Sequence, residues 1–167
     1  MALTFNAHEI FEMGVQIERN GKAFYEAAAK KASNGEVRDL FKELSTWEAG
    51  HITLFEKLRD ELPADAGTAD LYDPEGDAHL YLRAAADSHV FLKNKNAEAI
   101  AAKCKDAMAA LDMGVTFEKD SVVFYTTMKK VVPPALGKST IDRIIAEEIK
   151  HIGMLIDKEK QLVTKKK

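Results

Sequence analysis

Two short motifs in the chain combine residue types that bind metal ions. Glu48-Ala-Gly-His51 and Glu148-Ile-Lys-His151 each place a glutamate three positions before a histidine. Residues three apart share one face of an α-helix, so each motif can present a carboxylate and an imidazole to the same metal ion. None of the other histidines has a glutamate at that spacing, and we expect all of these to be surface or structural residues: His8, His79 and His89.

Both motifs belong to an internal repeat with an offset of 100 residues. Segment 13–20, Met-Gly-Val-Gln-Ile-Glu-Arg-Asn, recurs at 113–120 as Met-Gly-Val-Thr-Phe-Glu-Lys-Asp. In this register Glu18 corresponds to Glu118, and the first Glu-x-x-His motif corresponds to the second. The repeat predicts that one structural unit is used twice.

The elements that carry these residues are expected to be long helices. Apolar residues recur at helical spacing, and the four prolines interrupt the chain in two places only. We predict a helical hairpin at 6–62, a crossover at 63–96 with a short helix around 77–90, and a second hairpin at 97–163. The residues expected to start the four long helices are Asn6 with Glu9, Ser33 with Glu36, Asn94 or Asn96 (for a helix over 97–131), and Ser139 with Asp142.

The number of residues between each motif glutamate and the turn of its hairpin places the motif residues at one height along the bundle. The first turn, at Ser33, lies 15 positions after Glu18 and 15 before Glu48. Pro133 divides the second hairpin in the same way, 15 positions from Glu118 and from Glu148. Because both arms of a hairpin rise equally per residue, all four glutamates and both histidines can meet at one level of a four-helix bundle.

A buried cluster of four carboxylates requires positive charge, which two divalent metal ions supply. We predict a two-metal centre with Glu18 and Glu118 as terminal ligands, Glu48 and Glu148 as bridges, and His51 and His151 on one metal each, the plan known from di-metal bundles. Mixed carboxylate and imidazole ligands suit two iron ions, with manganese or a mixed pair as alternatives.

Tyr25 and Tyr125 follow Glu18 and Glu118 by seven positions, on the same helix face. Their hydroxyls are expected to support catalysis by hydrogen-bonding the metal ligands. The alternative is that both are ordinary core tyrosines.

Composition excludes several classes of protein. Lys and Arg total 24 against 27 Asp and Glu, a net charge of -3, so neither nucleic acid nor an anionic membrane is an expected partner. No apolar run approaches the ~20 residues of a membrane helix. Cys104 is the single cysteine, which excludes an internal disulfide or a four-cysteine metal site and favours a cytoplasmic location.

Through Glu18, Glu48-x-x-His51, Glu118 and Glu148-x-x-His151, the chain resembles the ferritin-like superfamily and, within it, the rubrerythrins over residues 6–163. The resemblance implies an all-α, ferritin-like di-iron bundle that reduces hydrogen peroxide or dioxygen in the response to oxidative stress, and a homodimer.

Rubrerythrins typically carry a further glutamate where this chain has Ser121, whose repeat counterpart is Gly21. These small residues are expected to leave room for the oxidant. The cysteines of the rubrerythrin iron-sulfur domain are missing, so electrons are expected from an external donor protein.

Three other functions are open on the sequence alone. The chain could be an iron-binding or storage module that oxidises ferrous ion, which would bind many irons in a large assembly. It could catalyse a manganese catalase-like reaction, which measurement of the bound metal would distinguish from a reaction at iron. A metal-free structural bundle would gain stability from removal of Glu48 without any change in metal uptake.

Overall fold

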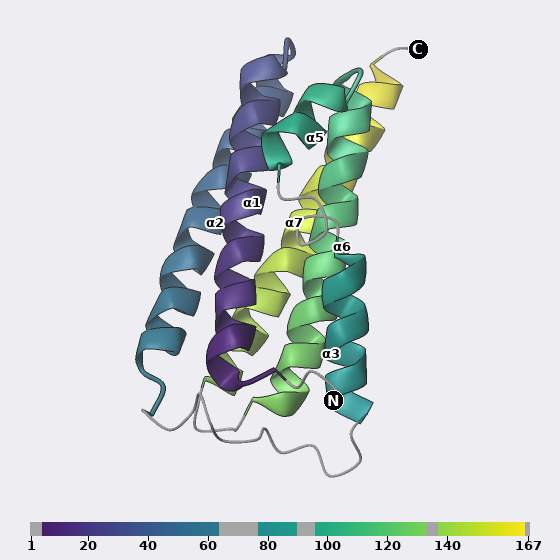
Figure 1. Cartoon of the computed structure of the whole chain (residues 1–167). Coiled ribbons are helices and arrows are strands. Elements are labelled where there is room, and N and C mark those ends of the chain that lie inside the picture. Colours follow the sequence, from purple (N-terminus) through teal and green to yellow (C-terminus); the bar gives the residue numbers. More distant parts are fainter. Residues whose placement is uncertain (1–4, 64–76, 90–95, 133–136, 166–167) are drawn as a thin grey trace.

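A computed structural model describes residues 5–63, 77–89, 96–132 and 137–165. The described elements are all helical, and four long helices run side by side (Figure 1). The helices are α1 (Ala7–Lys31), α2 (Gly35–Asp60), α3 (Asp77–Ser88), α5 (Ala97–Lys103), α6 (Ala107–Val131) and α7 (Lys138–Thr164). Helices α1 and α2 form the first hairpin, and α6 and α7 form the second, so the predicted all-α architecture of two hairpins is confirmed.

The shorter helices pack on the outside of this bundle. Helix α3 lies along α6, close to the expected short helix at 77–90, and α5 packs against α1 (Figure 1). The expected irregular link at 63–76 and the turn at Pro133-Pro134 fall almost entirely outside the described residues.

Helix starts follow local hydrogen-bonding chemistry. Asn6 and Glu9 form the expected reciprocal capping box at α1. At α2 the expectation of Ser33 is wrong, because the side chain of Asn34 accepts the hydrogen bond from the Val37 amide. Asn96 caps α5 as expected.

Helix α7 begins at Lys138, one residue before the expected Ser139. Gly137 precedes it at φ 98, a left-handed conformation that favours glycine, and no side chain caps this end.

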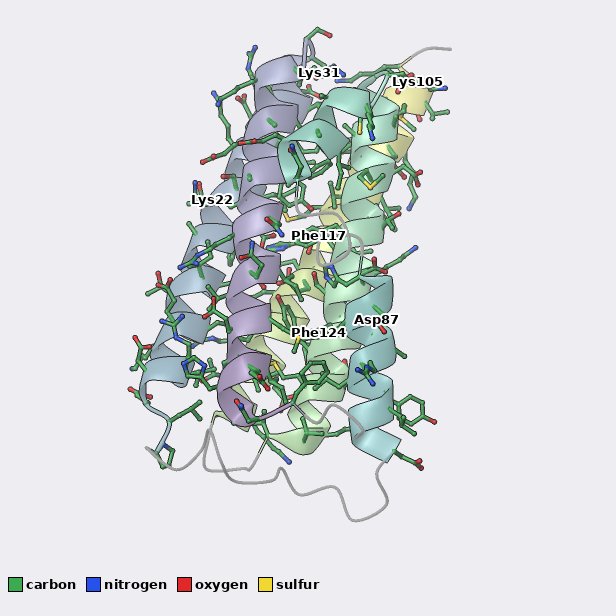
Figure 2. The ribbon with its side chains drawn as sticks, in the orientation of Figure 1. Lys22, Lys31, Asp87, Lys105, Phe117 and Phe124 are labelled. Carbon is green, nitrogen blue, oxygen red and sulfur yellow. The ribbon has the colours of Figure 1, made fainter. Side chains whose placement is uncertain are left out.

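The single helix expected over 97–131 is also wrong, because the chain breaks between Lys103 and Ala107. Asp106 starts a new helix there by accepting a hydrogen bond from the Ala109 amide. Lys31 of α1 donates to the carbonyl oxygens of Ala102 and Cys104, so the end of α5 is tied to the end of α1 (Figure 2). The break lets α5 lie across α1 while α6 continues the bundle.

Aromatic side chains fill the interior between the helices. Phe117 and Phe124 of α6 are fully buried (Figure 2), and His89, just after α3, packs edge-on against both rings. The Nε2 atom of His89 lies 3.3 Å from Ser121 Oγ. His89 is therefore a structural residue, as expected. In the described part of the chain, no helix is long and apolar enough to cross a membrane.

Burial lowers the pKa of His89 from 6.5 to about 3, and this shift predicts an acid-sensitive fold. The unfolded chain takes up a proton at His89 below pH 6.5, whereas the folded chain does not until about pH 3, so stability is lost as the pH falls through that window. We expect wild type to lose up to about 4 kcal/mol more than His89→Gln between these limits. Urea unfolding across the pH range measures the difference, and exposed His8→Gln is the control. Parallel pH profiles for wild type and His89→Gln would contradict the expectation.

Candidate metal centre

The six residues of the repeated motifs meet in the middle of the bundle. Helix α1 contributes Glu18, α6 contributes Glu118, and α2 and α7 each contribute a glutamate and a histidine. All six residues are buried, with whole-residue exposures between 0% and 1%: Glu18, Glu48, His51, Glu118, Glu148 and His151. The structure thus brings together every residue that the sequence predicted as a ligand. Their assignment as ligands stays a prediction.

The side chains form two overlapping groups, each with the geometry to hold one metal ion. In the first group, Glu18, Glu48, His51 and Glu148 offer ligand atoms within 4.8 Å of one another. The second group consists of Glu48, Glu118, Glu148 and His151 at the same separation. Glu48 and Glu148 belong to both groups, which is the arrangement that two bridging carboxylates require.

Both histidines direct Nδ1 towards the carboxylates. His51 Nδ1 lies 3.0 Å from Glu148 Oε1 and 3.4 Å from Glu18 Oε2. His151 Nδ1 lies 2.9 Å from Glu148 Oε2 and 3.6 Å from Glu118 Oε1. The two imidazole rings stack with their centroids 5.9 Å apart. Each Nδ1 therefore faces the carboxylates of its own group.

Many of the buried polar atoms lack a hydrogen-bond partner among the described residues. Both oxygens of Glu48 are among them, and each of the other glutamates has one such oxygen. Leaving a buried polar atom unpaired costs about 1–3 kcal/mol, and more for a charged group. The complete set is Glu18 Oε2, Glu48 Oε1 and Oε2, His51 Nδ1, Glu118 Oε2, Glu148 Oε1 and His151 Nε2. A cluster of unpaired oxygen and nitrogen donors is the chemistry that a metal ion satisfies.

The pKa values of the glutamates show that negative charge is unfavourable in this buried cluster. Burial, reinforced by Glu18 and Glu148, raises the pKa of Glu48 well above its usual range. Burial and Glu148 raise the pKa of Glu118 likewise. Burial alone would raise the pKa of Glu148 too, but its interactions with the imidazoles of His151 and His51 outweigh burial and lower that pKa to about 2.

The histidines balance this charge by holding protons. Burial alone would lower the pKa of His151, but its interactions with the carboxylates of Glu118 and Glu148 raise it to about 9. The pKa of His51 is raised further by Glu148 and Glu18, again against the effect of burial. In the metal-free protein, the protons on the two histidines thus supply the positive charge that bound metal ions would otherwise supply. Metal binding has to displace these protons.

Two tyrosines link the hairpins through hydrogen bonds to the cluster. The Tyr25 hydroxyl donates to Glu118 Oε1 at 2.5 Å, and the Tyr125 hydroxyl donates to Glu18 Oε1. Each tyrosine therefore binds the glutamate of the other hairpin. Burial and the neighbouring carboxylates raise the pKa of both hydroxyls, so they remain donors at neutral pH. The hydrogen bonds orient the two predicted terminal ligands.

The expected room beside Gly21 and Ser121 is occupied. A Cβ atom on Gly21 would lie 2.4 Å from Phe117 Cζ, so the Phe117 ring fills the space. Ser121 is fully buried with His89 Nε2 3.3 Å from its hydroxyl. The prediction that these small residues make space for an oxidant is therefore wrong for the described structure.

Sequence reasoning missed Glu147, whose Oε2 accepts a hydrogen bond of 2.8 Å from His51 Nε2. It also gave no functional role to Trp47, whose indole packs edge-on against His151 with ring centroids 5.6 Å apart. The signal that could have found both is the repeat, because 47 and 147 are equivalent positions next to the motif glutamates.

Comparisons with known proteins agree with this fold. A crystal structure from Thermotoga maritima, described as a ferritin-like diiron-carboxylate protein, superposes with a TM-score of 0.69. It is 21% identical, and the match covers 96% of this chain and 98% of that one. No curated protein matches the sequence significantly.

The fold is thus that of a ferritin-like helical bundle, and its buried carboxylate and histidine cluster has the geometry to hold metal ions. The Rubrerythrin family model matches residues 9–102, more than half of the chain. The chain therefore belongs to the rubrerythrin family.

Proposed function

We propose that this protein is a di-iron oxidoreductase that reduces hydrogen peroxide, or else dioxygen, with electrons from a separate donor protein. The observation that carries the proposal is the pair of overlapping ligand groups that share Glu48 and Glu148. Two ions held by these shared carboxylates would be close enough to act on one small oxidant.

The charge and donor chemistry support two ferrous ions. Four glutamates supply four negative charges, and two divalent cations neutralise them within the buried cluster. Oxygen donors with one imidazole per metal suit iron or manganese better than a closed zinc site. Glu18 and Glu118 would be terminal ligands, Glu48 and Glu148 bridges, and His51 and His151 would bind one metal each.

When bound, two ferrous ions supply the two electrons that convert one hydrogen peroxide and two protons to two waters. The chain's own residues hold and shield the reacting centre. Tyr25 and Tyr125 fix the orientation of Glu118 and Glu18, and Glu147 fixes the His51 ring. The surrounding aromatic residues exclude bulk water, which strengthens the interaction between the carboxylates and the cations.

The electrons that restore the ferrous state would come from another protein. Cys104 is the sole cysteine, and burial raises its pKa, so the chain offers no dithiol that could act as an internal reductant. A homodimer is the assembly that we propose.

The test is rapid mixing of the anaerobic, ferrous-loaded protein with hydrogen peroxide. We expect two irons per chain, oxidation faster than that of free ferrous ion, and one peroxide consumed per two irons. Oxidation at the rate of free ferrous ion would exclude a peroxidase, after which the same mixing with dioxygen tests the alternative oxidant. Uptake of many irons per chain in a large particle would favour storage, and manganese in the purified protein would favour a catalase-like reaction.

A further inference from the structure

The two ends of the metal cluster are covered differently, although the repeat makes them equivalent. On the His151 side, the Trp47 ring packs edge-on against the imidazole. The Lys150 ammonium lies 4.8 Å from the centre of that indole ring, on its face. A large aromatic side chain and a cation thus cover His151.

On the His51 side, the equivalent positions hold Glu147 in place of Trp47 and Gly50 in place of Lys150. The Glu147 side chain contacts His51 Nε2 at 2.8 Å and is 28% exposed, whereas the His51 side chain is 2% exposed. A Cβ atom on Gly50 would meet nothing within 4 Å in the described part of the chain. This side therefore has a carboxylate that reaches from solvent to the buried imidazole.

A surface depression of about 380 Å³ lies over this side. Its lining consists of Thr46, Trp47, Gly50, His51, Leu54 and Glu147. The depression thus includes both the buried ligand candidate His51 and the carboxylate that contacts it. Its one carboxylate, that of Glu147, offers the oxygen ligands that a hydrated divalent cation prefers, while the rest of the lining is mostly apolar.

We propose that divalent metal ions enter and leave the cluster through this depression, with Glu147 as the first carboxylate that they meet. The inference rests on the proposed two-metal centre and adds a difference between its two sites. The metal at His51 exchanges rapidly with solvent. The metal at His151, covered by Trp47 and Lys150, exchanges slowly because it has to pass through the first site.

Release of iron to a chelator tests the proposal without any measurement of activity. Protein loaded anaerobically with ferrous ion is mixed with excess chromophoric ferrous chelator, after the iron bound per chain has been counted. We expect two phases of equal amplitude, one iron each. Gly50→Leu fills the depression and is expected to slow the fast phase about tenfold.

The matched control is Gly153→Leu, since Gly153 is also an exposed helical glycine whose Cβ would meet nothing within 4 Å among the described residues. It gains the same side chain outside the depression and should release iron as wild type does. Glu147→Gln retains an acceptor for His51 Nε2 but loses the charge. It is expected to slow ferrous uptake several-fold at low salt, with final occupancy still two per chain.

The outcomes separate this inference from the proposed function. Two irons bound but released in one phase, or equal release from Gly50→Leu and Gly153→Leu, would overturn the access route and leave the two-metal centre standing. Unchanged uptake by Glu147→Gln would overturn the role of that carboxylate. A chain that binds no iron would overturn both the centre and the route.

Discussion

Glu48→Gln is expected to make the metal-free protein more stable and, at the same time, to reduce its metal uptake. Both oxygens of Glu48 are buried without a hydrogen-bond partner among the described residues, and burial with Glu18 and Glu148 raises its pKa. Glutamine has the same size but no charge, so the gain should be about 1–3 kcal/mol. Loss of a bridging carboxylate is expected to reduce metal binding from two ions to at most one per chain. Denaturant unfolding of chelator-treated protein and elemental analysis measure the two effects.

The pH dependence of the gain checks its cause. A carboxyl group whose pKa is raised by folding contributes full stability below its unfolded pKa, near 4.5, and loses it as the pH rises towards the folded value. The advantage of Glu48→Gln in the metal-free protein should therefore grow from pH 4.5 to neutrality.

Glu43→Gln is the matched control, because Glu43 is an exposed glutamate of the same helix. It should change neither stability nor uptake. A Glu48→Gln protein that gained stability but still bound two ions would indicate a structural bundle with its metals elsewhere.

The centre of this protein was predictable because it depends on fixed geometry. A helix rises equally per residue in both arms of a hairpin, so the turns near Ser33 and Pro133 place four glutamates at one height. The repeat then superposes the second set on the first. Neither step needs knowledge of side-chain packing, which explains why all six cluster residues meet as predicted.

The remaining features depend on competition between near-equal alternatives. Ser33 and Asn34 are both good caps, and in the structure Asn34 takes this role. The break before α6 combines the Asp106 cap with a contact from Lys31, which lies more than 70 residues away in the chain. The contact of Glu147 with His51 depends on the rotation of α7 relative to α2. Helical periodicity alone does not determine any of these.

Gly21→Ala is expected to destabilise the protein, although alanine is the better helix former by about 1 kcal/mol. The added Cβ atom would lie 2.4 Å from Phe117 Cζ and 3.4 Å from Glu48 Cδ. Phe117 is fully buried, and the centroids of the Tyr25 and His89 rings each lie 5.9 Å from the centroid of its ring. The Phe117 ring therefore has little space into which to move. Overpacking of this kind costs about 1–3 kcal/mol, so we expect a net loss of up to about 2 kcal/mol after the helical gain. Thermal and urea unfolding measure the loss.

The repeat supplies the rescue for this variant. Ile17 occupies the position equivalent to Phe117, and Ser121 occupies the position equivalent to Gly21, so the other half of the protein combines a smaller residue with a Cβ atom. In a Phe117→Ile background, the additional substitution Gly21→Ala should therefore cost much less stability than it costs in the wild-type protein. Gly153→Ala, whose Cβ would meet nothing within 4 Å in the described structure, should instead stabilise α7. If the effects of Gly21→Ala and Phe117→Ile on stability were additive, contact with the Phe117 ring would not be the reason for glycine at position 21.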